Sequence, residues 1–122
     1  MYPYSNEPIP APIVSIEISA AYNPNTKSQR DALIDSGADT SCIPPSVINE
    51  LNLIPIRDEA VRGVTGETNL YIYAVNIRFH GIIFSNLSVI GLPEEDIPLI
   101  GRDILNKLHL CLDGPQKIIT VV

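Results

Sequence analysis

The chain has 122 residues, which is the length of one domain. Hydrophobic residues make up 45% and charged residues 18%, so the chain can bury a core and is not a disordered tail. Eight basic against fourteen acidic residues give a net charge of −6 without any basic cluster, which excludes a typical nucleic-acid-binding protein. No apolar stretch approaches the roughly 18 residues of a membrane helix, so we expect no membrane partner.

The first half of the chain is predicted to be rich in strands. Residues 1–12 contain four prolines and little periodicity, which predicts an extended or mobile arm ahead of a single domain over 13–122. Apolar and polar residues then alternate over 14–20, as in a half-buried strand. The cluster 23–26 predicts a turn, and the short apolar run 32–34 predicts a buried strand that ends at Asp35.

The second half continues this pattern. Two prolines at 44 and 45 predict one or two turns of helix starting near Pro45. Alternation over 71–79 predicts a long strand, and 83–90 reads as its returning partner. An acidic loop follows over 92–98, and helical spacing follows at 104–108. The last residues predict a hairpin built from 110–112 and 118–122. The predicted fold is all-β, with one clear helix near the C-terminus.

The most informative local feature is Asp35-Ser36-Gly37 at the end of the buried strand. A carboxylate in this position lies beside apolar surroundings, and the glycine permits a tight turn. The tripeptide alone is more typical of an ordinary turn at a strand end than of an active site. The longer segment reads Asp35-Ser36-Gly37-Ala38-Asp39-Thr40.

Together with the apolar run 32–34, this segment resembles the active-site motif of the retropepsin-like aspartic proteases. Further segments match in the order of that family. Gly63-Val64-Thr65-Gly66 is similar to the tip of the flap hairpin, and 99–105 is similar to the apolar-apolar-Gly segment that enters the C-terminal helix. The resemblance covers roughly residues 13–122. It implies a small, closed, barrel-like acid-protease fold with a flap hairpin and one short C-terminal helix.

The resemblance also implies an activity. An aspartic protease needs two carboxylates that share one proton, so that one activates a water while the other polarises the scissile carbonyl. This chain contains one Asp-Ser-Gly, so the second Asp35 must come from an identical chain across a two-fold axis. The expected protein is therefore a homodimeric endopeptidase that cuts extended peptide or protein substrates without metal or organic cofactor. The alternative is a dimer of the same fold that binds peptides but cuts them poorly or not at all.

The resemblance assigns further roles. Ser36 would hydrogen-bond across the dimer beneath the two aspartates, and Gly37 would keep backbone groups near the substrate. Ala38 belongs to the same supporting loop, and Asp39 with Arg102 is similar to the buried ion pair that joins this loop to the C-terminal helix. A solvated charge at the helix start is the alternative for Arg102. The flap residues Gly63, Val64, Thr65 and Gly66 would offer backbone groups to the substrate.

Other features leave alternatives open. A metal site from His109 and Cys111 with Cys42 or His80 lacks the paired local spacing of zinc sites. Cys42 as a nucleophile, with His80 or His109 as base, is a second alternative. The N-terminus lacks the features of a signal peptide, so we expect a cytoplasmic protein with free thiols; its start at Met favours a stand-alone bacterial member. The predicted C-terminal hairpin leaves open how the dimer is sealed.

Overall fold

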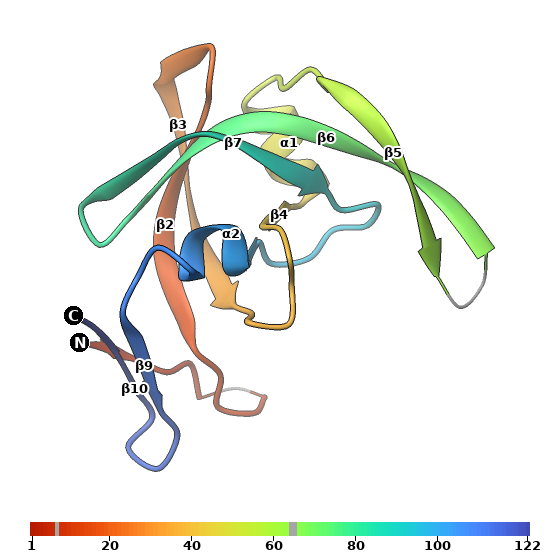
Figure 1. Cartoon of the computed structure of the whole chain (residues 1–122). Helices are drawn as coiled ribbons and strands as arrows, with labels where there is room; N and C mark the ends of the chain where they lie inside the picture. Colours follow the sequence, from red (N-terminus) through yellow and green to blue (C-terminus); the bar gives the residue numbers. More distant parts are fainter. Residues whose placement is uncertain (7, 64–65) are drawn as a thin grey trace.

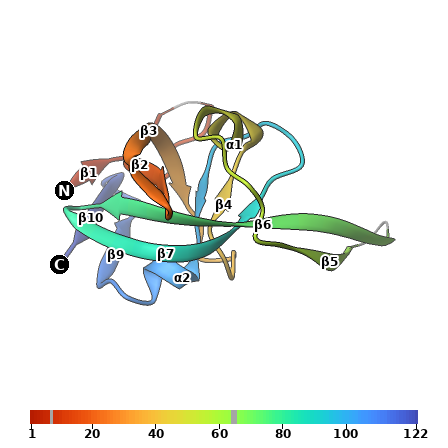
Figure 2. The ribbon, with the colours of Figure 1, turned by 90° about the horizontal axis from the view of Figure 1, so that it is seen from above.

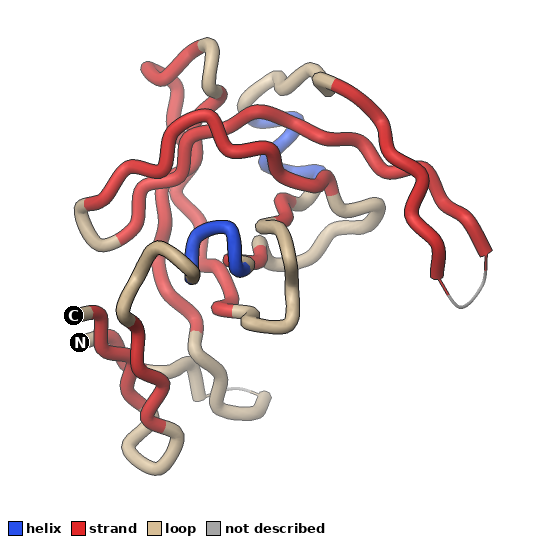
Figure 3. The backbone as a smooth tube through the Cα atoms, in the orientation of Figure 1, coloured by secondary structure: helices blue, strands red, loops and turns tan. Residues whose placement is uncertain are grey.

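The computed structural model describes residues 1–6, 8–63 and 66–122, and strands dominate it (Figures 1 and 3). The strands are β1 (Tyr2–Pro3), β2 (Ile13–Ala20), β3 (Asn23–Ile34), β4 (Cys42–Ile43), β5 (Arg57–Gly63), β6 (Gly66–Phe79), β7 (Ile82–Gly91), β8 (Leu99–Ile100), β9 (Leu110–Asp113) and β10 (Ile118–Val121). The helices are α1 (Pro45–Glu50) and α2 (Arg102–Leu105). Neither helix is long and apolar enough to span a membrane, in the part of the chain that is described. The all-β prediction is confirmed.

Seven strands form one sheet that closes on itself. Their order is β2-β3-β8-β4-β7-β6-β5, and β2 also pairs with β6. That extra pairing closes six of the strands into a barrel, as the sequence resemblance implies. β5 remains outside the ring and forms, with the first part of β6, a hairpin that extends from the barrel (Figures 1 and 2).

The alternating residues of the long strands fill the barrel. Val14, Ile16 and Ile18 of β2 are at most 3% exposed, and so are Val75 and Ile77 of β6. In a strand every second side chain points to the same face, so the apolar positions of these segments face inward together. Each such burial stabilises the fold by about 1.5–3 kcal/mol before entropy is considered.

The turn predicted over residues 23–26 is wrong, because these residues begin β3. Ala20 pairs with Asn23, so the turn consists of residues 21–22, next to a register shift at Ser19/Ala20. Pro24 is tolerated there because β8 pairs only with Leu33 and Ile34, at the other end of β3. The short strand expected at 32–34 is therefore the end of a 12-residue strand.

The shorter predicted elements are largely confirmed. α1 begins at Pro45, as predicted from the proline pair. His80 (φ 54°) and Gly81 (φ 73°) form a two-residue turn between β6 and β7, and both have the left-handed backbone that a type I′ turn requires. α2 ends at Leu105, earlier than the helical spacing predicted. The chain after it continues in tight turns up to Leu108.

The two ends of the chain meet in a second sheet. β9 and β10 form the predicted C-terminal hairpin, and β1 pairs with β10 through Tyr2↔Ile119 and Pro3↔Ile118. The Tyr2 hydroxyl also lies 2.6 Å from Nδ1 of His80, in the turn between β6 and β7. Tyr2–Pro3 is thus extended and paired, which is the first of the two alternatives considered for the N-terminal arm.

Candidate active site

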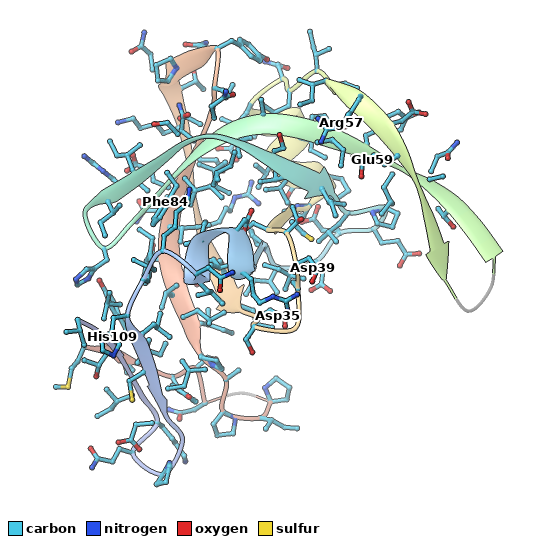
Figure 4. All side chains as sticks on the ribbon, in the orientation of Figure 1. Asp35, Asp39, Arg57, Glu59, Phe84 and His109 are labelled. Carbon is cyan, nitrogen blue, oxygen red and sulfur yellow. The ribbon has the colours of Figure 1, made fainter. Side chains whose placement is uncertain are left out.

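The loop that follows β3 carries Asp35 at the mouth of the barrel. β3 runs parallel to β8, and the Asp35 N–H continues this pairing by donating to the Ile100 carbonyl at 2.9 Å. β8 in turn lies between β3 and β4, so the residues on both sides of the loop are anchored to one short strand. Asp35 and Asp39 lie between the β5–β6 hairpin and the terminal hairpin β9–β10 (Figure 4).

The carboxylate of Asp35 is oriented by its own loop. The Gly37 N–H donates to Oδ1 of Asp35 at 2.9 Å, and the Ala38 N–H donates to the Asp35 backbone carbonyl at 3.2 Å. A Cβ atom at position 37 would lie 3.2 Å from the same Oδ1, which is a crowded contact. Glycine at 37 therefore lets the backbone approach the half-exposed carboxylate closely.

Arg102 connects α2 to this loop at two points. Its Nη1 donates to the Ser36 carbonyl at 2.7 Å, and its Nη2 pairs with Oδ1 of Asp39. The predicted ion pair is formed. The expectation that it is buried is not met in the single chain, because the side chains of Arg102 and Asp39 are 42% and 84% exposed. The ion pair therefore contributes more to the position of the loop than to the free energy of unfolding, because exposed pairs contribute only about 0–1 kcal/mol.

A second, buried attachment was not predicted. The Ser41 hydroxyl donates to Oδ1 of Asp103 at 2.7 Å, and the Ser41 N–H lies 3.1 Å from both carboxylate oxygens. The Gly101 N–H donates to the Ser41 hydroxyl oxygen at 3.0 Å, and Ser41 is fully buried. An acidic residue in the first turn of a helix is a weak sequence signal for Asp103, but nothing local points to Ser41.

Gly101 permits the close contact between α2 and the loop. A Cβ atom at this position would lie 2.7 Å from the Thr40 carbonyl carbon and 2.9 Å from the Ala38 carbonyl oxygen. The Arg102 N–H also donates to that Ala38 oxygen at 2.9 Å. The apolar-apolar-Gly segment therefore ends in glycine because the active-site loop packs directly on its backbone.

The predicted flap residues fall on the β5–β6 hairpin. Its pairing runs from Arg57↔Ile72 to Gly63↔Gly66, so Gly63 and Gly66 face each other at its end. Val64 and Thr65 lie outside the described residues. The structure thus contains a long hairpin at the position of the predicted flap, and a contact of this hairpin with substrate belongs to the proposal below.

The acidic loop over 92–98 is hydrogen-bonded to α1. Both carboxylate oxygens of Glu95 accept from Ser46, one from its N–H at 2.9 Å and one from its hydroxyl at 2.7 Å. Arg30 donates to the same Ser46 oxygen at 2.7 Å and to Glu50 at 2.6 Å. A cavity of about 330 Å³ lies beside this network, between α1, β6 and Leu92–Pro93, and the Asp35 loop does not line it.

The alternative sites gain no support from the geometry. Burial raises the pKa of the Cys42 thiol, and the nearby carboxylates of Asp103 and Asp35 raise it further. A thiol with a raised pKa stays protonated at neutral pH and is a poor nucleophile. The described residues contain no group of three or more His, Cys, Asp and Glu side chains that could hold a metal ion.

Comparison with known proteins agrees with this geometry. The family model for retroviral aspartyl protease matches residues 9–113. The inhibitor-bound EIAV protease is 23% identical, with a TM-score of 0.60 over 84% of this chain and 91% of that chain. The simian foamy virus (mac) protease is 22% identical, with a TM-score of 0.59 over 78% of this chain and 92% of that chain. No curated protein matches. A match over most of the chain, on a fold that these proteases share, means that the chain belongs to the retroviral aspartyl protease family.

Proposed function

We propose that the protein is an aspartic endopeptidase that hydrolyses peptide bonds in extended polypeptides as a homodimer, with one Asp35 from each chain. The observation that carries this proposal is the setting of Asp35. It is the aspartate of the single Asp-Ser-Gly, it is half-exposed at the barrel mouth, and its carboxylate is oriented by the Gly37 N–H. Arg102 and Asp103 hold that loop to α2 from two sides.

In the proposed reaction the two carboxylates hold one proton between them. The ionised Asp35 takes a proton from a water molecule, whose oxygen attacks the scissile carbonyl carbon, while the protonated Asp35 donates to the carbonyl oxygen. The tetrahedral intermediate then collapses with cleavage of the C–N bond, and the leaving nitrogen receives a proton from a carboxyl group. Placing both groups in a fixed loop supplies the orientation that the attack needs.

The substrate would lie between the Asp35 loop and the β5–β6 hairpin. β5 is the last strand of the large sheet, so its outer edge has backbone groups that an extended peptide can pair with. Closure of this hairpin over the peptide would exclude bulk water from the reaction. Cys42 and Cys111 are both free, which fits the further proposal that the enzyme works in the reducing cytoplasm.

A digestion of a peptide library tests the proposal, with Asp35→Asn as the inactive variant. Asparagine keeps the shape and an oxygen that can accept from the Gly37 N–H, so the fold should be retained. Asp31→Asn is the matched control, because Asp31 is an exposed residue of β3, the strand that leads into the Asp35 loop. We expect the wild type and the control to cleave peptides and Asp35→Asn to cleave none.

Two results would contradict the proposal that the protein is an aspartic endopeptidase. Cleavage by Asp35→Asn at the wild-type rate would show that the Asp35 carboxylate takes no part in the reaction. Binding of peptides by wild type and Asp35→Asn alike, without cleavage by either, would identify a peptide-binding module instead. Mass spectrometry of the digest reports cleavage and specificity, and fluorescence anisotropy of a labelled peptide reports binding.

A further inference from the structure

The terminal sheet lies beside the candidate active site and has one edge that faces it. Its order is β1-β10-β9, so β1 and β9 are its two edges. Seen from above, β9 is the edge nearer to α2 and β1 is the far edge (Figure 2). A second chain that brings another Asp35 against the first would therefore meet β9 and not β1.

The two edges also differ in their capacity to pair. β1 has two residues, and one of them is Pro3, which has no N–H to donate. β9 has four residues, and its first three, Leu110, Cys111 and Leu112, carry neither charge nor proline. Soluble proteins normally protect an exposed edge with such residues, so an unprotected β9 indicates that another strand covers it.

The hairpin hydrogen bonds determine which backbone groups of β9 point outward. The Val122 N–H donates to the His109 carbonyl at 2.9 Å, so His109 directs its backbone groups toward β10. Backbone direction alternates along a strand, so Cys111 also bonds to β10, while Leu110 and Leu112 direct their N–H and C=O groups to the open edge.

The pairing of β10 with β1, on the side away from β9, gives the same alternation independently. The Tyr4 N–H donates to the Lys117 carbonyl at 2.9 Å, so Lys117 faces β1. The next residue along, Ile118, must then face β9, where it is the partner of Asp113. Asp113 and Cys111 have the same direction, and Leu112 between them has the opposite one.

This alternation selects one register for two copies of β9. In an antiparallel pair about a two-fold axis at Cys111, Leu110 lies opposite Leu112 of the partner subunit, and Leu112 opposite Leu110 of the partner subunit. All outward N–H and C=O groups of Leu110 and Leu112 are then used, in about four hydrogen bonds. If the axis lay at Leu110 or at Leu112 instead, that leucine would pair with its own copy. The other leucine would then lie opposite a residue outside β9.

The side chains fit the same register. Leu112 lies opposite Ile119 on one face of the sheet, yet Ile119 is fully buried and Leu112 is 43% exposed. Leu110 lies on that face too and packs against the core. Across the proposed axis, Leu112 would pack beside Leu110 of the partner subunit, so its exposed apolar surface would be covered.

We propose that two copies of the chain join through β9 and form one six-stranded antiparallel sheet, with Cys111 at the two-fold axis. Each chain completes its own hairpin first, so the sheet contains whole hairpins side by side and no exchanged strands. This inference rests on the proposed function, because that function requires a second copy of Asp35.

Disulfide trapping tests the register. In Cys42→Ser protein, Cys111 is the only thiol, and in the proposed register its Cα lies about 4.5 Å from that of its copy, a separation that a disulfide can span. Two comparison proteins carry Cys42→Ser and Cys111→Ser with either Leu110→Cys or Leu112→Cys. Each of these thiols would lie about 7–8 Å from its own copy, on the diagonal. After oxidation with diamide, we expect a covalent dimer for Cys111 and little for the shifted positions, on non-reducing gels.

Edge variants test the surface without a thiol. Leu112→Lys places a charge on the open edge, and Leu112→Pro removes an N–H that the hairpin does not use. Gln116→Lys adds the same charge at the exposed hairpin turn and is the control. We expect both Leu112 variants to raise the dimer dissociation constant at least tenfold in sedimentation experiments, with unchanged circular dichroism, and the control to behave as wild type.

The outcomes separate this inference from the proposed function. Trapping strongest at position 110 or 112, or Leu112→Lys protein that dimerises like the wild type, would overturn the inference, even if peptides are cut in an Asp35-dependent reaction. Trapping at Cys111, together with a library that stays uncut, would leave the dimer contact standing and overturn the proposed activity.

Discussion

Ser41 and Asp103 are 62 positions apart in the sequence, yet both the N–H and the hydroxyl of Ser41 donate to the Asp103 carboxylate. The same hydroxyl oxygen accepts from the Gly101 N–H. This small buried network joins the end of the active-site loop to the first turn of α2. It complements the exposed contact of Arg102 with Ser36 and Asp39 on the other side of the loop.

Ser41→Ala should lower the free energy of unfolding by about 1–3 kcal/mol, because it leaves the buried Gly101 N–H without its acceptor and removes the hydroxyl hydrogen bond to Oδ1 of Asp103. Ser85→Ala is the control, since Ser85 is exposed on β7. Chemical denaturation monitored by circular dichroism measures both. Equal stability of the two variants would show that the Ser41 hydroxyl contributes nothing net.

Gly101→Ala should destabilise the protein by about 1–3 kcal/mol, because the added methyl group would meet the Thr40 backbone at 2.7 Å. Backbone atoms on both sides must then move, and the Asp35 loop moves with them. Gly114→Ala is the matched control, since nothing lies within 4 Å of a Cβ atom there. Thermal unfolding compares the two. A melting temperature for Gly101→Ala equal to that of Gly114→Ala would contradict the close packing.

The sequence predicted the parts of this fold that local pattern controls. Alternation located β2 and β6, because one face of each strand is buried in a barrel and the other is not. The proline pair located α1, and the Asp-Ser-Gly motif located the loop. Each of these signals is carried by a few neighbouring residues, so it can be recognised without knowing which distant element packs against them.

The remaining features depend on partners far away in the sequence. The residues 23–26 have a typical turn composition, but pairing of Asn23 with Ala20 extends β3 through them. Pairing of β1 with β10 joins the two ends of the chain, and no local pattern reports it. Ser41 and Asp103 are each unremarkable in sequence and become important only when α2 packs on the loop.

Arg102→Lys should reduce turnover more than stability. Lysine has one compact charge and cannot bond the Ser36 carbonyl and Asp39 together, as the planar guanidinium does. Because the pair is exposed, the free energy of unfolding should change by less than about 1 kcal/mol. A displaced Asp35 loop should lower kcat by roughly 10- to 100-fold. Arg78→Lys, at an exposed position where β6 pairs with β2 and β7 of the barrel, is the control. Retention of full kcat by Arg102→Lys would contradict the positioning role.

Stability should fall in acid partly through Glu50. Hydrogen bonds from Arg30, and then from Ser28, hold the pKa of Glu50 below its ordinary value. Such a group stabilises the folded state fully above its ordinary pKa, and this contribution is lost as the pH falls through the lowered value. Glu50→Gln should therefore reduce the loss of melting temperature below about pH 4.3 relative to wild type. Glu94→Gln, in an exposed loop, is the control; an identical pH dependence for Glu50→Gln and wild type would contradict this role.

The rate of peptide cleavage should show a bell-shaped dependence on pH. Two carboxylates that share one proton titrate as a pair, in two steps that belong to neither group alone. Only the singly protonated pair holds both a base for the water and an acid for the carbonyl oxygen, so the rate falls in acid as the base is lost. It falls again toward alkali, when the shared proton leaves. Initial rates between pH 3 and 9 measure the profile, and sedimentation at each pH separates these limbs from dissociation of the dimer. A rate that still rises above about pH 8 would contradict a shared proton, and the Cys42→Ser variant would then test whether the thiol carries the reaction.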